Sequence, residues 1–131
     1  MKITKATPIL VVDRIEPALA LWTGPLGYQK TVEVPHGDRA GFVLLVKEGH
    51  EVMLQTRASV EEDLPAMAKL DARAAMYLDV PSLASAKREL EKIEGVEVLV
   101  PERTTFYGAR ELWIRDGAGN VIGFAEQVNA R

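Results

Sequence analysis

The stretch Ile9–Asp13, with the sequence ILVVD, is an apolar run that ends in an aspartate, and AMYLD at Ala75–Asp79 has the same pattern. Each stretch is followed by an Ala- and Leu-rich segment of helical pattern that stops at a glycine, Gly27 in the first case and Gly95 in the second. The two aspartates are 66 residues apart and the two glycines 68. The repetition predicts a strand–helix–strands unit used twice, with a functional cleft between its halves.

The composition is that of one folded domain with an ordinary core. The 131 residues are 47% apolar and 27% charged, the net charge is −3, and Lys and Arg are scattered along the chain. Nucleic-acid binding, which needs a concentrated basic face, is therefore not expected. The absence of cysteine excludes disulfides, thiol nucleophiles and Cys-type zinc sites. No apolar run approaches the roughly 18 residues of a membrane span, and the first run is too short for a secretion signal, so we expect a cytoplasmic protein.

Hydrophobic periodicity predicts the elements of the two copies. In the first copy, or module 1 at about 1–57, we expect a strand over 3–12, a helix over 16–26 and strands over 31–34, 41–47 and 51–56. In module 2, at about 74–131, we expect a strand over 74–80, a helix over 83–94 and strands over 96–100, 110–115 and 121–127. Residues 58–73 are predicted as a polar linker with room for a helical turn, and residues 101–108 as a loop.

Alternation along these strands separates two faces of the predicted sheet. The face expected to pack on the helices carries Leu10, Val12, Val52, Leu54, Met76, Leu78, Leu112 and Ile114. The opposite face carries Thr7, Ile9, Val11, Met53, Gln55, Ala75, Tyr77, Glu111, Trp113, Val121 and Gly123. Because this second face mixes aromatic and apolar groups with a few polar ones, it is a candidate small-molecule pocket, with a dimer interface or a second core as alternatives.

Short motifs in both copies carry a family resemblance. They are TPILVVD at 7–13, LWT at 21–23, LGY at 26–28, YGARE at 107–111 and RDGAGN at 115–120. The chain resembles the vicinal oxygen chelate superfamily, which includes glyoxalase I, extradiol dioxygenases, fosfomycin-resistance transferases and bleomycin-resistance proteins, and looks closest to the last of these. The resemblance implies an α+β fold of paired βαβββ modules whose sheets curl into a partly closed barrel. It also implies a homodimer in which two chains complete each cleft.

The resemblance further implies where a divalent metal would bind. Enzymes of this superfamily hold the metal with four side chains, drawn from His, Glu and Gln, near the middle of the first and last strand of each module. These positions fall here at Thr7, Gln55 (Leu54 if the register shifts), Ala75 and Gly123. Only Gln55 carries a suitable donor, so we expect no metal site and no cofactor, and metal-dependent catalysis of the superfamily type is disfavoured.

The histidines do not replace the missing ligands. His36 and His50 are expected in a loop and in a tight strand turn, where solvated histidines are commoner than ligands or bases. A novel site from Glu111 and one histidine would supply only two ligands. With no cysteine and no Ser–His pairing indicated, nucleophilic catalysis has no activated nucleophile, and we assign no catalytic residue.

Aromatic side chains mark the expected ligand surface. By resemblance, Tyr77 and Tyr107 fall where bleomycin-resistance proteins carry tryptophans that line the drug crevice. Phenol rings would also stack on a heteroaromatic ligand and would add a hydrogen bond. Phe106 lies in the same loop as Tyr107, and Trp113 lies on the predicted cleft face, whereas Trp22 is expected in the core.

Two charged residues complete the candidate site. Glu111 would neutralise a cationic group on a ligand, or alternatively pair with Arg110, Arg115 or a cross-strand residue. Arg39 stands where the resemblance implies a stacking phenylalanine, and it suits a carboxylate or phosphate, although a loop arginine is more often solvated. The full predicted ligand-binding set is Arg39, Met53, Gln55, Tyr77, Phe106, Tyr107, Glu111 and Trp113.

Three functions remain open from the sequence. The first is a metal-free homodimer that sequesters an antibiotic or another partly aromatic small molecule in clefts at the dimer interface, without making bonds. The second is a metal-dependent lyase, isomerase or dioxygenase with a non-standard site. The third is a non-catalytic dimerisation or regulatory module whose cleft is filled by its own side chains. The expected partners are thus a small molecule and a second copy of the chain, with no nucleic acid and no membrane.

Overall fold

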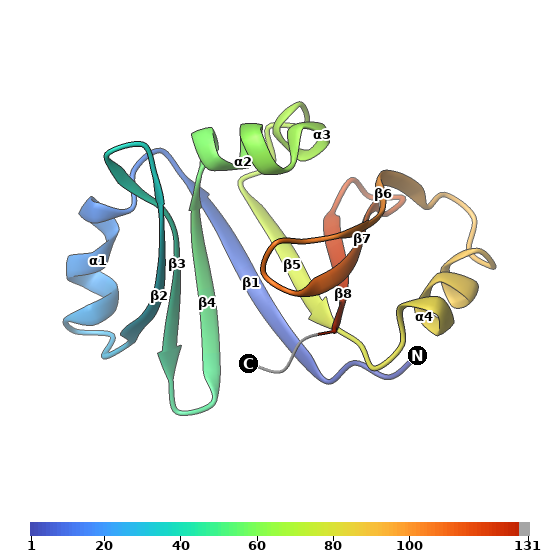
Figure 1. Ribbon diagram of the computed structural model, residues 1–131, viewed down its shortest axis with the longest axis horizontal. Coiled ribbons are helices and arrows are strands. Elements are labelled where there is room, and N and C mark those ends of the chain that lie inside the picture. Colours follow the sequence, from blue (N-terminus) through green and yellow to red (C-terminus); the bar gives the residue numbers. More distant parts are fainter. Residues whose placement is uncertain (129–131) are drawn as a thin grey trace. The chain divides into compact units, whose positions relative to one another are not determined.

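The computed structural model describes residues 1–128, which form two compact units (Figure 1). The N-unit comprises residues 7–74, and the C-unit comprises residues 1–6 together with the residues from 75 onward. The segment 58–73, predicted as a linker, is folded and belongs to the N-unit. The first six residues belong to the C-unit, where the Thr4 backbone N–H donates to the Asp79 carbonyl at 2.9 Å.

The N-unit is a mixed sheet in the order β2-β3-β4-β1. Its elements are β1 (Lys5–Val12), α1 (Glu16–Thr23), β2 (Gln29–His36), β3 (Arg39–Lys47), β4 (His50–Thr56), α2 (Arg57–Asp63) and α3 (Pro65–Ala68). Strand β1 runs parallel to β4, and the β2–β3 and β3–β4 pairs are antiparallel. The Thr56 side chain begins α2 by accepting a hydrogen bond from the Ser59 backbone N–H at 3.1 Å.

The C-unit repeats this plan with the order β5-β8-β7-β6. Its elements are β5 (Ala74–Asp79), α4 (Leu83–Leu90), β6 (Glu97–Thr104), β7 (Ala109–Arg115) and β8 (Val121–Gln127). Strand β5 runs parallel to β8, and the β6–β7 and β7–β8 pairs are antiparallel. The predicted α+β fold of paired βαβββ modules is therefore confirmed.

The predicted helix-facing sides of the two sheets are also confirmed. In the N-unit, Val52 and Leu54 pack in a core with Ile15, and Trp22 of α1 covers its edge as expected. In the C-unit the core joins Leu83 and Ala86 of α4 to strand residues Leu112, Ile114 and Phe124. Met76, expected on this side, is 39% exposed. None of the helices within residues 1–128 combines the length and apolarity that crossing a membrane requires.

Several predicted boundaries were wrong. Helix α1 ends at Thr23 instead of residue 26, because Pro25 lacks a backbone N–H and disfavours helical geometry at Gly24 before it. Helix α4 ends at Leu90 instead of residue 94. Strand β6 continues to Thr104, through residues predicted as a loop, and its register against β7 shifts around Pro101. A proline is tolerated there because β6 is the last strand in the order of its unit.

Candidate functional site

A fully buried carboxylate, that of Glu111 on β7, is the centre of a hydrogen-bonded cluster in the C-unit. Its Oε1 accepts hydrogen bonds from the indole N–H of Trp113 at 2.9 Å and from Nη2 of Arg103 at 3.0 Å. Its Oε2 accepts from the hydroxyls of Tyr77 and Tyr107. We call these five side chains the Glu111 cluster.

Strand register explains how these residues meet. Arg103 on β6 lies directly opposite Glu111 on β7, and Trp113 follows two residues later on the same face. Trp113 in turn pairs with Gly123, which pairs with Tyr77 on β5. The register of four neighbouring strands thus brings these side chains together on one face of the C-unit sheet.

The turn between β6 and β7 supplies the last member of the cluster. The Thr105 N–H donates to the Ala109 carbonyl at 2.8 Å, and the Thr105 hydroxyl accepts from the Ala109 N–H at 3.0 Å. Gly108 has a φ of 87°, a conformation that favours glycine. This tight turn carries Tyr107 back over the strand, where its hydroxyl reaches Glu111.

The negative charge of Glu111 is balanced by the positive charge of Arg103 within the C-unit. Burying a carboxylate is costly unless it is paired and hydrogen-bonded, and Arg103, whose side chain is 25% exposed, supplies the counter-charge. The pKa of Tyr77 lies far above its usual range, because burial disfavours the phenolate and the Glu111 charge repels it. Tyr77 therefore remains a protonated donor at neutral pH.

The hydrogen bonds of Glu111 limit its chemistry. An ionised carboxylate offers about four lone-pair sites, and here each oxygen already accepts from two different side chains. No lone pair is left to take a proton from a substrate or to bind a metal. In this arrangement Glu111 positions its aromatic neighbours.

The residues at the implied metal positions do not fit a divalent metal. At Gly123 a Cβ atom would lie 2.8 Å from three atoms of the Trp113 ring, so the ring occupies the space that a ligand side chain needs. The Gln55 amide nitrogen donates to the Ser59 hydroxyl at 3.0 Å, and Ala75 has no donor atom. Within residues 1–128 no three His, Cys, Asp or Glu side chains are grouped to hold a metal.

Thr7, at the remaining implied position, is fully buried. Its hydroxyl has no hydrogen-bond partner among the described residues. A neutral threonine hydroxyl is nevertheless a weak ligand for transition metals, so Thr7 does not restore the site.

The structure brings together five of the predicted ligand-binding residues. Tyr77, Glu111 and Trp113 are buried, with the Tyr77 and Trp113 ring centroids 5.8 Å apart. Tyr107 is 38% exposed, and Phe106 is 83% exposed and meets Tyr107 edge to face with centroids 5.0 Å apart. The cross-strand pairing that was one alternative for Glu111 is observed, with Arg103 as the partner.

The other three predicted ligand-binding residues belong to the N-unit. Arg39 is exposed at the start of β3, Met53 is half-buried on β4, and Gln55 is 8% exposed. His36, predicted as a solvated loop residue, ends β2 and pairs with Glu62 of α2 at 2.6 Å. His50 is exposed at the start of β4, next to a tight turn, as expected.

Arg103 is the member of the cluster that the sequence prediction missed. It was lost because Pro101 was taken to begin a loop. The β-branched pair Thr104 and Thr105 beyond the proline was the available signal that a strand continues. A strand extended to residue 104 would have included Arg103, but the two register shifts between Val98 and Arg103 are what place it opposite Glu111.

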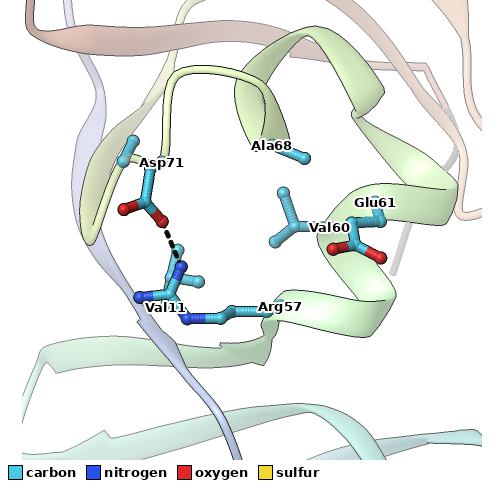
Figure 2. Close-up of a pocket in the computed structure, with 7 residues that line it drawn as sticks. Val11, Arg57, Val60, Glu61, Ala68 and Asp71 are labelled. Atoms are coloured by element: carbon cyan, nitrogen blue, oxygen red, sulfur yellow. Dashed lines mark hydrogen bonds and ion pairs between the residues drawn. The ribbon is translucent and has the colours of Figure 1, made fainter.

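A small cavity in the N-unit was also missed (Figure 2). Its volume is about 80 Å³, and its lining is Val11, Arg57, Val60, Glu61, Ala68, Asp71 and Ala72. Arg57 pairs with Asp71, as Figure 2 shows, and its Nε also donates to the Asp13 carboxylate at 2.8 Å. Most of these residues lie in segment 58–73, which was predicted as a linker and was not expected to line a cavity.

Comparison with known proteins shows similarity of structure only. No protein-family model and no curated protein sequence matches the chain. A glyoxalase/bleomycin resistance protein/dioxygenase superfamily member from Vibrio splendidus 12B01 matches 93% of this chain and 97% of its own, with a TM-score of 0.68 and 16% identity.

Two methylmalonyl-CoA epimerases match as well. For the Mycobacterium tuberculosis epimerase the TM-score is 0.70 at 21% identity, over 97% of this chain and 90% of the other. For the Streptomyces coelicolor epimerase the TM-score is 0.65 at 14% identity, over 98% of this chain and 100% of the other. At these identities the likeness concerns the fold, and the site residues must be interpreted on their own.

Proposed function

We propose that this chain, which has the fold of the vicinal oxygen chelate (glyoxalase/bleomycin resistance/dioxygenase) superfamily, is a metal-independent binding protein for a small, partly aromatic molecule. The observation that carries the proposal is the state of Glu111. Its carboxylate is fully buried, and both oxygens are occupied by donors. A carboxylate in this state is itself engaged by four donors, which supports a role in holding the aromatic side chains of a binding surface.

The exposed aromatic pair beside the cluster is the proposed contact surface. Phe106 presents a ring that is 83% exposed and meets the Tyr107 ring edge to face. Tyr107 is fixed in turn by its hydrogen bond to Glu111. A planar ligand ring would stack on Phe106, with Tyr77 and Trp113 forming the wall behind the Tyr107 hydroxyl.

The remaining predicted contacts belong to the same proposal. Arg39, Met53 and Gln55, which belong to the N-unit, stay predicted ligand contacts, and a second copy of the chain would complete the cleft. Sequestration of an antibiotic is one form that this binding would take. In every form the ligand is captured by stacking and hydrogen bonds, and no bond in it is broken.

The test is a comparison of matched probes and variants. Planar probes of one ring system and different charge, 1-naphthoate and 1-naphthylmethylammonium, are titrated into the protein and followed by saturation-transfer NMR. Since an aromatic contact is worth about 0.5–1.5 kcal/mol, Phe106→Ala should weaken binding roughly two- to tenfold. The control Ile93→Ala removes an apolar side chain that is 61% exposed in the same unit and should change nothing.

A second candidate function, a non-catalytic interaction module, has one observation in its favour. Tyr77 and Trp113 are only 4% and 2% exposed, as expected where a cleft is filled by its own side chains. This function predicts that neither probe binds and that native mass spectrometry of the purified protein finds no retained small molecule. Probe binding that is equal in Phe106→Ala and the parent protein would also contradict our proposal. The described residues give no such support to the metal-dependent alternative.

A further inference from the structure

The four donors to Glu111 differ in how firmly the fold holds them. Tyr77 and Trp113 lie on strands β5 and β7 and are only 4% and 2% exposed. Arg103 belongs to strand β6, and its side chain is 25% exposed. Tyr107 is 38% exposed and lies in the turn between β6 and β7, outside both strands. Tyr107 is therefore the donor whose side chain can leave the carboxylate with the least disturbance of the sheet.

The backbone under Tyr107 is held by hydrogen bonds, so a displacement would involve the side chain alone. The Thr105 N–H donates to the Ala109 carbonyl at 2.8 Å, and the Val128 N–H donates to the Gly108 carbonyl at 2.9 Å. A rotamer change of a partly exposed side chain is fast and leaves such backbone bonds intact. It would open a space with the shape of a phenol, because the Tyr107 ring and hydroxyl fill that space now.

The space behind Tyr107 has a defined chemistry. Its inner end is Oε2 of Glu111, which would keep the hydrogen bond from Tyr77 and lose the one from Tyr107. A buried carboxylate oxygen that loses a donor favours a replacement, since burial penalises an unsatisfied charge. The Phe106 ring borders this space, because it meets the Tyr107 ring edge to face with centroids 5.0 Å apart. The ligand that fits is an aromatic ring with an O–H or N–H donor at its edge, which is what Tyr107 itself presents.

Charge disfavours the anionic relatives of such a ligand. A phenolate or a carboxylate offers no donor, and it would place a second negative charge next to Glu111, whose own charge is already balanced by Arg103. A neutral ring without a donor can contact Phe106, but it cannot replace the hydrogen bond that Tyr107 gives up. The site therefore selects for a neutral ring that carries a donor.

We propose that Tyr107 is a displaceable occupant of the binding site, and that the ligand is a phenol or another neutral aromatic donor that takes its place on Glu111. This inference rests on the proposed function, to which it adds the chemical class of the ligand and the movement that admits it. The ligand competes with a donor on the same chain, so its apparent affinity is lowered by the fraction of molecules in which Tyr107 occupies the site. Removing Tyr107 should therefore tighten binding, which is the reverse of what the loss of a ligand contact does.

The test titrates three single-ring probes into the parent protein, Tyr107→Phe and Tyr107→Ala. Phenol carries the donor, anisole has a methyl group in place of that hydrogen, and benzoate is an anion. Because a hydrogen bond to a charged group would keep Tyr107 on Glu111 in roughly nine-tenths of the molecules or more, phenol should bind Tyr107→Ala about ten- to a hundredfold more tightly than the parent. Its dissociation constant for that variant should be on the order of 0.1–1 mM. Tyr107→Phe, which keeps the ring, should give an intermediate value, and anisole and benzoate should show no such series.

The indole N–H of Trp113 is the reporter, because it donates to the other oxygen of the same carboxylate at 2.9 Å. In the ¹⁵N-labelled protein its resonance should shift saturably with phenol, whereas the indole resonance of Trp22 in the N-unit should not. Tyr28→Phe is the matched control, since it removes a phenol hydroxyl from the N-unit and should leave phenol binding unchanged. Thermal unfolding checks that each variant folds, and Tyr107→Phe decides the outcome if Tyr107→Ala does not.

Equal affinity of phenol for the parent and the folded Tyr107 variants, or equal affinity of phenol and anisole for those variants, would overturn the inference. If the naphthalene probes bind the parent and lose affinity in Phe106→Ala while phenol binding does not depend on Tyr107, the inference fails and the proposed function stands. If neither the naphthalene probes nor phenol bind to the parent or to any variant, both fail.

Discussion

The two units share one strand-pairing scheme but fill equivalent register positions with different side chains. In the N-unit a residue of β1 pairs with one of β4, which pairs in turn with one of β3. In the C-unit the same chain of pairs runs from β5 to β8 to β7. The positions equivalent in this scheme are Tyr77 and Val11, Gly123 and Gln55, and Trp113 and Phe42. Two residues before Trp113 stands Glu111, whereas Ala40 stands two residues before Phe42.

At these positions the N-unit is stabilised mainly by apolar packing, whereas the C-unit is stabilised by a buried polar cluster. Of the N-unit positions, Val11, Phe42 and Ala40 are apolar and make non-directional contacts, whereas Gln55 makes one hydrogen bond, to the Ser59 hydroxyl. The C-unit positions depend on one another, because four donors share one buried carboxylate. We therefore expect substitutions at these C-unit positions to be more costly than substitutions at their N-unit equivalents.

The largest effect that we expect from breaking this asymmetry is at Glu111. Glu111→Ala leaves Arg103, two hydroxyls and an indole N–H without their acceptor, and should lower the free energy of unfolding by about 3–5 kcal/mol. Urea unfolding followed by circular dichroism measures it. The control Glu102→Gln breaks a partly exposed ion pair with Arg110 and should cost less than about 1 kcal/mol. Equal costs for the two variants would contradict the role given to the cluster.

A smaller loss is expected when a methyl group is added at Gly123. Its Cβ would lie 2.8 Å from three atoms of the Trp113 ring, so Gly123→Ala should cost about 1–3 kcal/mol through overpacking. Gly117→Ala is the matched control, since nothing lies within 4 Å of the added Cβ. Thermal unfolding of both variants checks this, and a neutral Gly123→Ala would mean that the ring moves aside freely.

The pH dependence of stability tests the C-unit cluster separately, through Tyr77. Because the pKa of Tyr77 is raised by burial and by Glu111, the unfolded chain loses the phenolic proton first, from about pH 10 upward. The contribution of the Tyr77 hydroxyl to the free energy of unfolding is fully present below that pH. Above it, this contribution falls by about 1.4 kcal/mol per pH unit. The stability difference between the parent protein and Tyr77→Phe should therefore shrink between about pH 9 and 11. A constant difference over this range would refute the assignment.

The smallest effect should be the same in both units. The Thr56 and Ser82 side chains each accept from a backbone N–H at 3.1 Å and begin helices α2 and α4. Thr56→Ala and Ser82→Ala should each cost about 1 kcal/mol in urea unfolding. If the two values differ by more than twofold, the asymmetry between the units extends beyond the Glu111 cluster to their helices.

The parts of the fold that followed from sequence are those governed by period and by turn chemistry. Alternation over Ile9–Asp13 and over Ala75–Asp79 correctly separated the helix-facing residues from Tyr77 and Val11, because a strand has a fixed period of two. Strand β8 was predicted with the boundaries observed, since the turn cluster at 116–120 begins it sharply.

The parts that did not follow depend on contacts across the chain. Arg103 meets Glu111 because β6 continues past Pro101 and its register against β7 shifts twice, and no local pattern predicts those shifts. The burial of Trp113 similarly depends on Gly123 in the next strand, since a Cβ there would lie 2.8 Å from three atoms of the ring. The segment around Arg57 and Asp71 was predicted as a linker because its polar composition concealed a folded turn.

The close contact between Trp113 and Gly123 also makes it costly to introduce a metal-ligating side chain at position 123 by single substitutions in either order. A glutamate introduced first would collide with the indole. Trimming the tryptophan first would leave a void where a fully packed ring stood, a loss of about 3–5 kcal/mol for a large aromatic side chain. Either first step lowers the stability of the protein before any ligand is gained, so the two substitutions would have to be made together.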